Sequence, residues 1–211
     1  MTRSHAGGPA YNGSPRLADL VLVAVYQADP RRPAIRDRDA LGAALAVGLL
    51  AEQVFQKTID VTPDEMVWLR EPVPGPDPGD VLEVVRGRGL PAPVSAAVAV
   101  LAPGSAATVW ERLVRRGVAQ PVRGLLGHRP GFEFTDLCAT QWPRALFNTG
   151  LDAPDPTLAP VAVALWRILG CLGLDGFSVP AATAARLGRA ASRTSPVDPL
   201  LSALPDLAAR T

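Results

Sequence analysis

The longest apolar stretch of the chain covers residues 40–51, where the sequence ALGAALAVGLLA carries no charge. A single carboxylate, Glu52, follows on the same apolar surface. About a dozen apolar residues are too few to cross a bilayer, which needs roughly 20. A helix that is apolar on every side must be covered by other helices. The pattern therefore predicts a buried helix over residues 39–57, capped by Asp39, at the centre of a helical domain.

Shorter apolar runs, separated by Pro, Gly and Asp, divide the rest of the chain into further elements. The predicted helices cover residues 16–27, 81–86, 105–116, 138–147, 157–174 and 181–193. Two short strands are predicted at 58–61 and 66–69, and the arms of a second hairpin at 118–126 and 132–135. We expect a mainly α fold, a single helical domain over residues 15–211 with one or two β-hairpins, preceded by a disordered tail over residues 1–14.

Composition and charge exclude several classes of protein. The chain has 48% hydrophobic residues, 19% charged residues and a net charge of +1, so its overall field does not attract nucleic acid, and we expect no nucleic-acid partner. Phosphate-loop, dinucleotide and H-E-x-x-H motifs are absent from the sequence. Cys138 and Cys171 lack the spacing of a metal site. We therefore expect neither a metal nor another cofactor.

Glu52, the one acidic residue in the central apolar surface, has two interpretations. A lone carboxylate in such a surface can be a general base with a raised pKa. More often it accepts hydrogen bonds from a neighbouring backbone or pairs with an arginine, and we favour this interpretation. If the protein is an enzyme, its candidate acid–base residues are Glu52, Asp37 and Asp39.

Arginine residues gather around the second predicted hairpin. Between residues 111 and 144, six arginines and three acidic residues leave a local excess of three positive charges. The same region holds Leu125, Leu126, Phe132 and Phe134. This combination suits contact with an anionic membrane surface or self-association, because apolar tips enter the interface while guanidinium groups bind phosphate. The plainer interpretation is a hairpin whose apolar side packs on its own domain.

The order of these pieces resembles the Golgi phosphoprotein 3 family, in its bacterial, actinomycete-like branch. An apolar first helix and a loop precede the long helix, which ends in LLAEQVFQKTIDV. A proline-rich PVPGPDPGD segment, a helix closing WERLVRRGV, a hairpin and a late helix beginning DPTLAPVAVAL follow. The resemblance covers roughly residues 16–193, and residues 49–61 and 112–118 are its most specific parts.

This resemblance implies a single helical domain that binds a phosphoinositide head group in a shallow basic pocket and uses a projecting hairpin in self-association. The family's pocket uses a tryptophan before the long helix, an arginine in that helix's first half and two arginines at the start of the helix that ends at the Gly-Val pair. The corresponding positions here are Asp37, Ala46, Pro103 and Ala106, and none of them matches.

The nearby arginines that are candidates to replace the missing head-group residues are Arg36, Arg38 and Arg112. Because the pocket positions differ, binding of a monophosphorylated phosphoinositide does not transfer from the family. The expected ligand is instead phosphatidylinositol or another anionic phospholipid, recognised through its negative charge.

Two functions from different classes remain open. The first is a peripheral lipid-binding or adaptor protein at the cytoplasmic, inner face of a bacterial membrane, with the hairpin serving membrane contact or self-association. The second is a small-molecule enzyme of bacterial specialised metabolism that has reused the lipid pocket. A protein–protein scaffold without a ligand is a third alternative. Arginine supplies all basic residues except Lys57, which together with abundant Ala, Pro and Gly is typical of a high-GC bacterial genome.

Overall fold

The computed structural model describes residues 16–26, 34–35, 37–70, 83–85, 87, 89–122, 131–135, 137–152, 158–174, 179–192 and 195–209. These residues form a mainly helical fold, as predicted. The longer helices are α1 (Leu17–Tyr26), α2 (Arg38–Phe55), α4 (Val94–Arg115), α5 (Trp142–Thr149), α6 (Leu158–Cys171), α7 (Ala181–Ala191) and α8 (Asp198–Ala209). A 3-10 turn, η1 (Leu137–Gln141), precedes α5.

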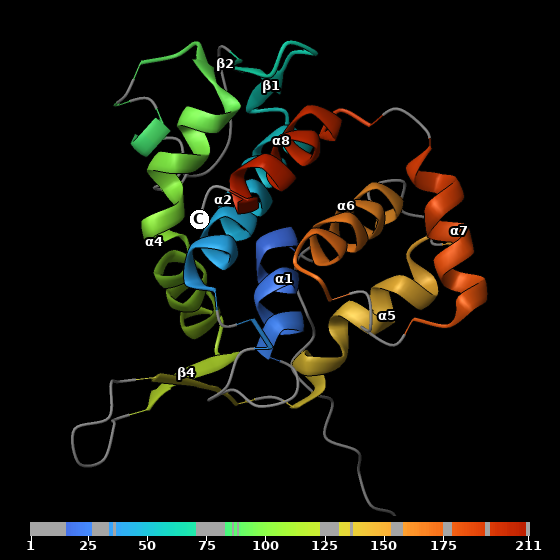
Figure 1. Ribbon diagram of the computed structural model, residues 1–211. Coiled ribbons are helices and arrows are strands. Elements are labelled where there is room, and N and C mark those ends of the chain that lie inside the picture. Colours follow the sequence, from blue (N-terminus) through green and yellow to red (C-terminus); the bar gives the residue numbers. More distant parts are fainter. Residues whose placement is uncertain are drawn as a thin grey trace, which may run out of the picture.

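The helix α2 is the predicted buried central helix. Every residue from Ala40 to Val54 is buried, and α2 packs against α1, α4 and α8 (Figure 1). The predicted cap was wrong by two residues. Asp37, and not Asp39, caps the helix, because the Asp37 carboxylate accepts hydrogen bonds from the backbone N–H groups of Asp39 and Ala40 at 2.9 and 3.0 Å.

Two glycines let α2 approach its neighbours closely. A Cβ atom at Gly42 would lie 2.8 Å from the backbone oxygen of Ala102 in α4. A Cβ atom at Gly48 would lie 3.1 Å from the Cα atom of Ala18 in α1. Only glycine fits without displacement of a neighbouring backbone, so these contacts fix how α1 and α4 lie on the central helix.

The helix α4 begins earlier than predicted, at Val94 rather than at residue 105. Pro103 lies inside it and removes one backbone hydrogen bond, which is the reason that the sequence pattern placed a helix start beyond it. The Ser105 hydroxyl lies 2.9 Å from the Gly42 carbonyl oxygen and ties this part of α4 to α2. By length and composition α4 could cross a membrane, but it is a packed helix of this bundle.

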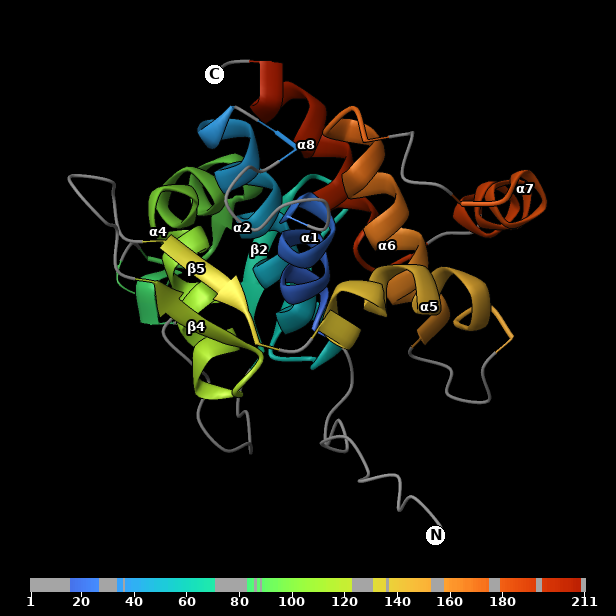
Figure 2. The ribbon, with the colours of Figure 1, turned by 90° about the horizontal axis from the view of Figure 1, so that it is seen from below.

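The last helix, α8, was not predicted. It packs against α2, α4 and α6, and its residues Leu200 and Leu204 are fully buried. Figure 2 shows α1 in the middle of the bundle, with α2 and α4 on one side and α5 and α6 on the other. The helix α7 lies outermost, against α6.

Both predicted hairpins are present. The strands β1 (Ile59–Val61) and β2 (Met66–Leu69) pair antiparallel, and a short strand that was not predicted, β3 (Ala92–Pro93), adds to β2. The second hairpin consists of β4 (Ala119–Val122) and β5 (Gly131–Phe134). It follows the end of α4 and lies at the lower end of the bundle in Figure 1.

The helices α2 and α4 end in the same hydrogen-bond pattern. At the end of α4, the N–H groups of Gly117 and Val118 donate to the carbonyl oxygens of Val114 and Leu113. Gly117 has a φ of +70°, which glycine adopts without strain. At the end of α2 the corresponding position is Lys57, with a φ of 59°, in the left-handed region that disfavours a side chain.

Candidate functional site

Four charged side chains meet inside the bundle: Asp19 of α1, Glu52 of α2, Arg112 of α4 and Arg116 at the end of α4. Asp19 is 0%, Glu52 5% and Arg112 8% exposed. The Arg112 guanidinium binds Glu52 through two parallel contacts, Nη1 to Oε2 at 2.7 Å and Nη2 to Oε1 at 2.9 Å. Its Nε atom donates to Asp19 Oδ1 at 2.7 Å. One arginine therefore joins three helices, and we call these four residues the buried charge cluster.

The carboxylates of the cluster have two further hydrogen-bond partners besides Arg112. Glu52 Oε1 accepts a hydrogen bond from the backbone N–H of Ala18 at 2.8 Å. Asp19 Oδ2 accepts one from Arg116 Nη1 at 2.8 Å. The favoured interpretation of Glu52, a partner for a backbone group and an arginine, agrees with this geometry, in which Glu52 has both.

Burial and charge act in opposite directions on the cluster. Burial raises the pKa of Asp19 to about 6, with a smaller rise from Glu52, against the lowering effect of Arg112 and Arg116. Burial disfavours the charged form of Arg112, but Glu52 and Asp19 outweigh it and raise the arginine's pKa above its ordinary value. Arg112 therefore stays charged, and burial makes the Asp19 carboxylate easier to protonate than an exposed aspartate.

The cluster is not arranged as an acid–base site. Both Glu52 oxygens accept hydrogen bonds inside the protein, so a substrate would have to displace Arg112 or Ala18 to reach them. The other candidate acids, Asp37 and Asp39, are exposed at the start of α2. Fifteen residues of helix separate Asp37 from Glu52, which corresponds to about 22 Å. The three carboxylates therefore do not share a site.

The predicted lipid-contacting arginines are likewise not brought together. Arg36 lies outside the described residues. Arg38 is exposed in the first turn of α2, where its charge opposes the rise that burial causes in the pKa of Tyr26. Arg112 contacts Glu52 of α2. Glu52 lies fourteen residues beyond Arg38 along α2, which corresponds to about 21 Å. The Arg112 guanidinium is occupied by the Asp19 and Glu52 carboxylates inside the fold, so we do not propose Arg112 as a head-group ligand.

Two of the positions that the resemblance aligns with a lipid pocket, Ala46 and Pro103, lie on α2 and α4. Ala46 is fully buried, and Pro103 is exposed on α4. The two helices approach so closely beside these positions that Gly42 contacts the backbone of Ala102. Packed backbone and alanine methyl groups thus occupy the space between the helices next to Ala46.

The base of the β4–β5 hairpin is anchored by aromatic rings. Trp110 of α4 stacks on Phe132 with a ring separation of 4.9 Å and an interplanar angle of 7°, and contacts Phe134 at 5.4 Å. Tyr26 of α1 meets the edge of Trp110 at 5.3 Å. Two of the four predicted apolar hairpin residues therefore pack on their own domain, Phe134 with only 8% exposure. The other two, Leu125 and Leu126, lie outside the described residues.

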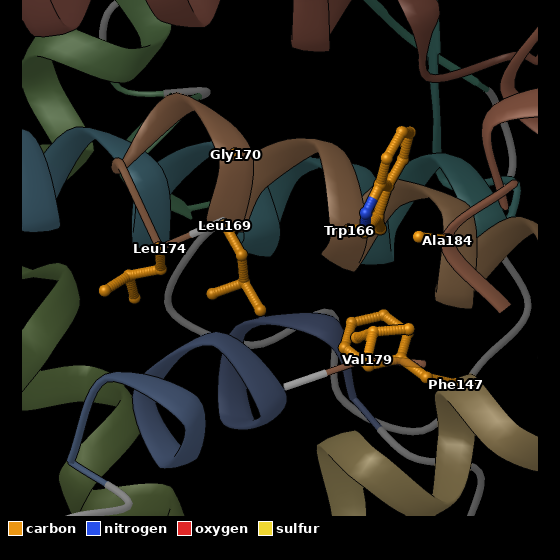
Figure 3. Close-up of a pocket in the computed structure, with 7 residues that line it drawn as sticks. All are labelled: Phe147, Trp166, Leu169, Gly170, Leu174, Val179 and Ala184. Carbon is orange, nitrogen blue, oxygen red and sulfur yellow. The ribbon is translucent and has the colours of Figure 1, made fainter. Parts of the chain in front are cut away.

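A small apolar cavity lies between α5, α6 and α7 (Figure 3). Its volume is about 50 Å³. Figure 3 shows Trp166 beside Ala184, with Phe147 and Val179 near them. The remaining lining residues are Leu169, Gly170 and Leu174. None of these lining residues has an acidic, basic or nucleophilic side chain.

Sequence reasoning missed Asp19, although the signal was present in a single acidic residue within the apolar run of α1. Among the described residues, no group of three or more His, Cys, Asp or Glu side chains is placed to hold a metal ion.

No protein-family model matches the sequence, and no curated protein matches it.

Proposed function

We propose that the protein is a peripheral membrane protein that binds anionic phospholipid surfaces through its β4–β5 hairpin, at the cytoplasmic face of a bacterial membrane. The observation that carries the proposal is the rigid attachment of this hairpin. Its base is fixed to α4 by Trp110, while the segment that joins its strands carries both cationic and apolar residues in the sequence. The resemblance to the Golgi phosphoprotein 3 family supports the same class of function.

The attachment of the hairpin is reinforced by its backbone. The Thr135 N–H donates to the Val118 carbonyl oxygen at 2.9 Å, and the Thr135 hydroxyl donates to the Gly117 carbonyl oxygen at 2.6 Å. These hydrogen bonds fix the base of the β4–β5 hairpin, so the pairing of β4 and β5 can persist while the connecting segment contacts a lipid interface. This is the property that a membrane-contacting loop requires.

The connecting segment, residues 123–130, supplies the expected chemistry. It contains Arg123, Arg129, Leu125 and Leu126. Each arginine near an anionic surface contributes about 1 kcal/mol and is screened by salt. Two arginines alone would give only weak binding, so insertion of the leucine side chains has to provide the rest. The proposal therefore predicts salt-sensitive binding with a preference for negative charge over any particular head group.

The strand register provides a specific test. Val122 and Gly131 are cross-strand partners, so a two-residue Asn-Gly turn can replace residues 123–130 and still close the hairpin. Flotation with vesicles of phosphatidylcholine containing phosphatidylglycerol or phosphatidylinositol should be lost in this variant. A matched control carries eight Gly and Ser residues in place of 123–130, which keeps the loop length but removes its chemistry.

Wild-type flotation should fall as salt is raised and should be absent with pure phosphatidylcholine vesicles. Both variants should keep the wild-type circular dichroism and tryptophan fluorescence, because Phe132 and Phe134 remain. Sedimentation velocity on the same proteins measures self-association through the hairpin. Undiminished flotation of the Asn-Gly variant would overturn the proposal that the hairpin binds the membrane.

The structure offers less support for an enzyme of specialised metabolism. The candidate acids Asp37, Asp39 and Glu52 do not meet, and the cavity at Trp166 has about 50 Å³. Sites for small-molecule substrates usually have roughly 300–1,000 Å³. We therefore do not propose a reaction.

A further inference from the structure

The helix α7 covers a cavity that the packing of α5 and α6 leaves unfilled. The bulky side chains of Phe147 and Trp166 meet small residues at Gly170 and Ala184, and a volume of about 50 Å³ remains between them (Figure 3). The side chains that line this space are aromatic or aliphatic, so none of them carries a charge. Because apolar cavities favour apolar ligands over water, the cavity is a candidate binding site for an apolar group.

The size and the lining of the cavity narrow the class of ligand. An apolar cavity of about 150 Å³ binds benzene, and the cavity at Trp166 has about a third of that volume. It is therefore too small for an aromatic ring, whereas the end of an unbranched alkyl chain is narrower. A carboxylate or an ammonium group would find no charged partner among the lining residues, so burial of a charged group is disfavoured.

The wall that α7 forms is the part of the cavity that can yield to a longer chain. In the bundle α7 lies outermost (Figure 2), where it packs against α6. Leu187 is the one buried residue of α7, and the ion pair of Arg186 with Asp152 is exposed. A small outward shift of α7 therefore exposes little apolar surface to water, so its cost in free energy is low.

We propose that the cavity between α5, α6 and α7 is a binding site for the end of an unbranched alkyl chain, with α7 as its movable wall. The inference goes beyond the proposed contact of the hairpin with a membrane and does not depend on it. A chain of this kind can belong to a lipid or to a free alkyl compound, and both sources present the same group to the cavity.

The first test titrates 1-butanol, 1-hexanol and 1-octanol into wild-type protein with isotope-labelled methyl groups. The methyl signals of Val179 and Ala184 should shift saturably, and nuclear Overhauser contacts should join them to the protons of octanol. Each additional buried methylene group should tighten binding by about fourfold until the chain fills the site. The absence of a saturable shift with all of these alcohols would show a packing void only and overturn the proposal. Tighter binding of benzene than of 1-hexanol would overturn the assignment to an alkyl chain.

The helix α7 offers a matched pair of variants. Ala184 lines the cavity, so Ala184→Leu places a larger apolar side chain in it and should weaken octanol binding by about tenfold or more. Ala185 is exposed on the same helix, and Ala185→Leu should keep the wild-type affinity. Equal affinities of the two variants would overturn the assignment to this cavity. If Ala184→Leu does not fold, the nuclear Overhauser contacts in wild type decide the location of the chain.

Two further measurements identify the source of the chain and separate this site from the hairpin. Lysophosphatidylcholine carries a single acyl chain and no net charge. A shift of the Ala184 methyl signal with both lysophosphatidylcholine and octanol would support a lipid chain, and a shift with octanol alone would support a free alkyl compound. The Asn-Gly replacement of residues 123–130 leaves every lining residue in place, so it should keep wild-type octanol binding.

The outcomes for the cavity and for the hairpin are therefore independent. Saturable octanol binding in a wild-type protein that does not float with anionic vesicles would support the alkyl site and overturn the proposed membrane contact. Flotation without octanol binding would overturn the alkyl site and leave the membrane contact supported.

Discussion

The helices α1 and α7 are both short and rich in small or apolar residues, yet they occupy different environments. All residues of α1 from Leu17 to Val25 are buried, including the charged Asp19. In α7, Leu187 is the buried residue, and Ala184 lines the cavity beside Trp166. Each helix also has an ion pair, Asp19 with Arg112 and Arg116 in α1, and Arg186 with Asp152 in α7.

These two ion pairs have very different consequences for stability. A buried carboxylate has lost its hydration, so removal of its partner leaves an uncompensated charge. Arg186 and Asp152 remain 39% and 66% exposed, so water replaces either partner readily. The comparison teaches that the stability of the α1–α2–α4 interface depends on complete pairing of its buried charges. The stability of the α6–α7 layer depends little on its exposed ion pair.

The largest expected effect is that of Arg112→Ala. Both Glu52 and Asp19 would lose their main partner inside the protein, and we expect a loss of about 3–5 kcal/mol in the free energy of unfolding. The matched variant Arg186→Ala should cost no more than about 1 kcal/mol. Urea denaturation of both proteins measures the difference. Similar midpoints would show that the buried charge cluster does not hold α1 in place.

The pH dependence of stability is the second test. Because the pKa of Asp19 is raised from 3.8 to about 6 in the folded protein, the folded state binds the proton more tightly than the unfolded state. This contribution to stability is fully present below about pH 4 and is lost as the pH rises through about 6.

The size of this contribution is up to about 3 kcal/mol, at about 1.4 kcal/mol for each pKa unit. Wild type should therefore lose stability relative to Asp19→Asn as the pH is raised from about 4 to about 7. Subtracting the two unfolding curves removes the effect of the other carboxylates. If the free energy of unfolding of wild type minus that of Asp19→Asn rises with pH, the predicted direction of the Asp19 effect is wrong.

A third test concerns the close contact of α2 with α4. Gly42→Ala places a methyl group 2.8 Å from the Ala102 oxygen, so the backbones must separate, and we expect a loss of about 1–3 kcal/mol. Gly104→Ala makes the same change at an exposed position of α4 with no atom within 4 Å, and should stabilise by roughly 0.5–1 kcal/mol. Thermal denaturation should therefore shift the two melting temperatures in opposite directions.

The smallest effect is expected in α7. A Cβ atom at Gly188 would have a single neighbour within 4 Å, the Cη2 atom of Trp166 at 3.9 Å. Gly188→Ala should therefore stabilise the helix by about 1 kcal/mol or slightly less. Hydrogen exchange of the α7 amides, compared with those of α1, checks this. Unchanged exchange in α7 would show that its opening does not involve unfolding of the helix.

The sequence was sufficient to predict the elements that carry strong local patterns. The charge-free run before Glu52 located α2, and the turn residues around Pro130 and Gly131 located the second hairpin. The first half of α4 was missed because Pro103 resembles a helix boundary in the sequence. Burial against α2 compensates for the hydrogen bond that this proline removes, and such tertiary packing is not visible in a local pattern.

The candidate site was less accessible to prediction. An ionic or backbone partner was expected for Glu52, but Arg112 lies 60 positions away along the chain, and only the folded arrangement selects it from twenty arginines. Asp19 and Arg116 are 97 positions apart. Pairs at this separation depend on how α1 and α4 cross, which is set by close contacts such as that at Gly48.

The left-handed residue at the end of α2 has a practical consequence. Lys57 is the single lysine among the 211 residues, and it is exposed. A lysine-specific protease therefore has one peptide bond to cut, between Lys57 and Thr58, and cleavage separates α1 and α2 from the rest of the chain. The Thr58 N–H and hydroxyl both bond to Gln53, so this bond enters a protease only after the turn opens. The rate of that single cut would report how often the end of the central helix opens in the native protein.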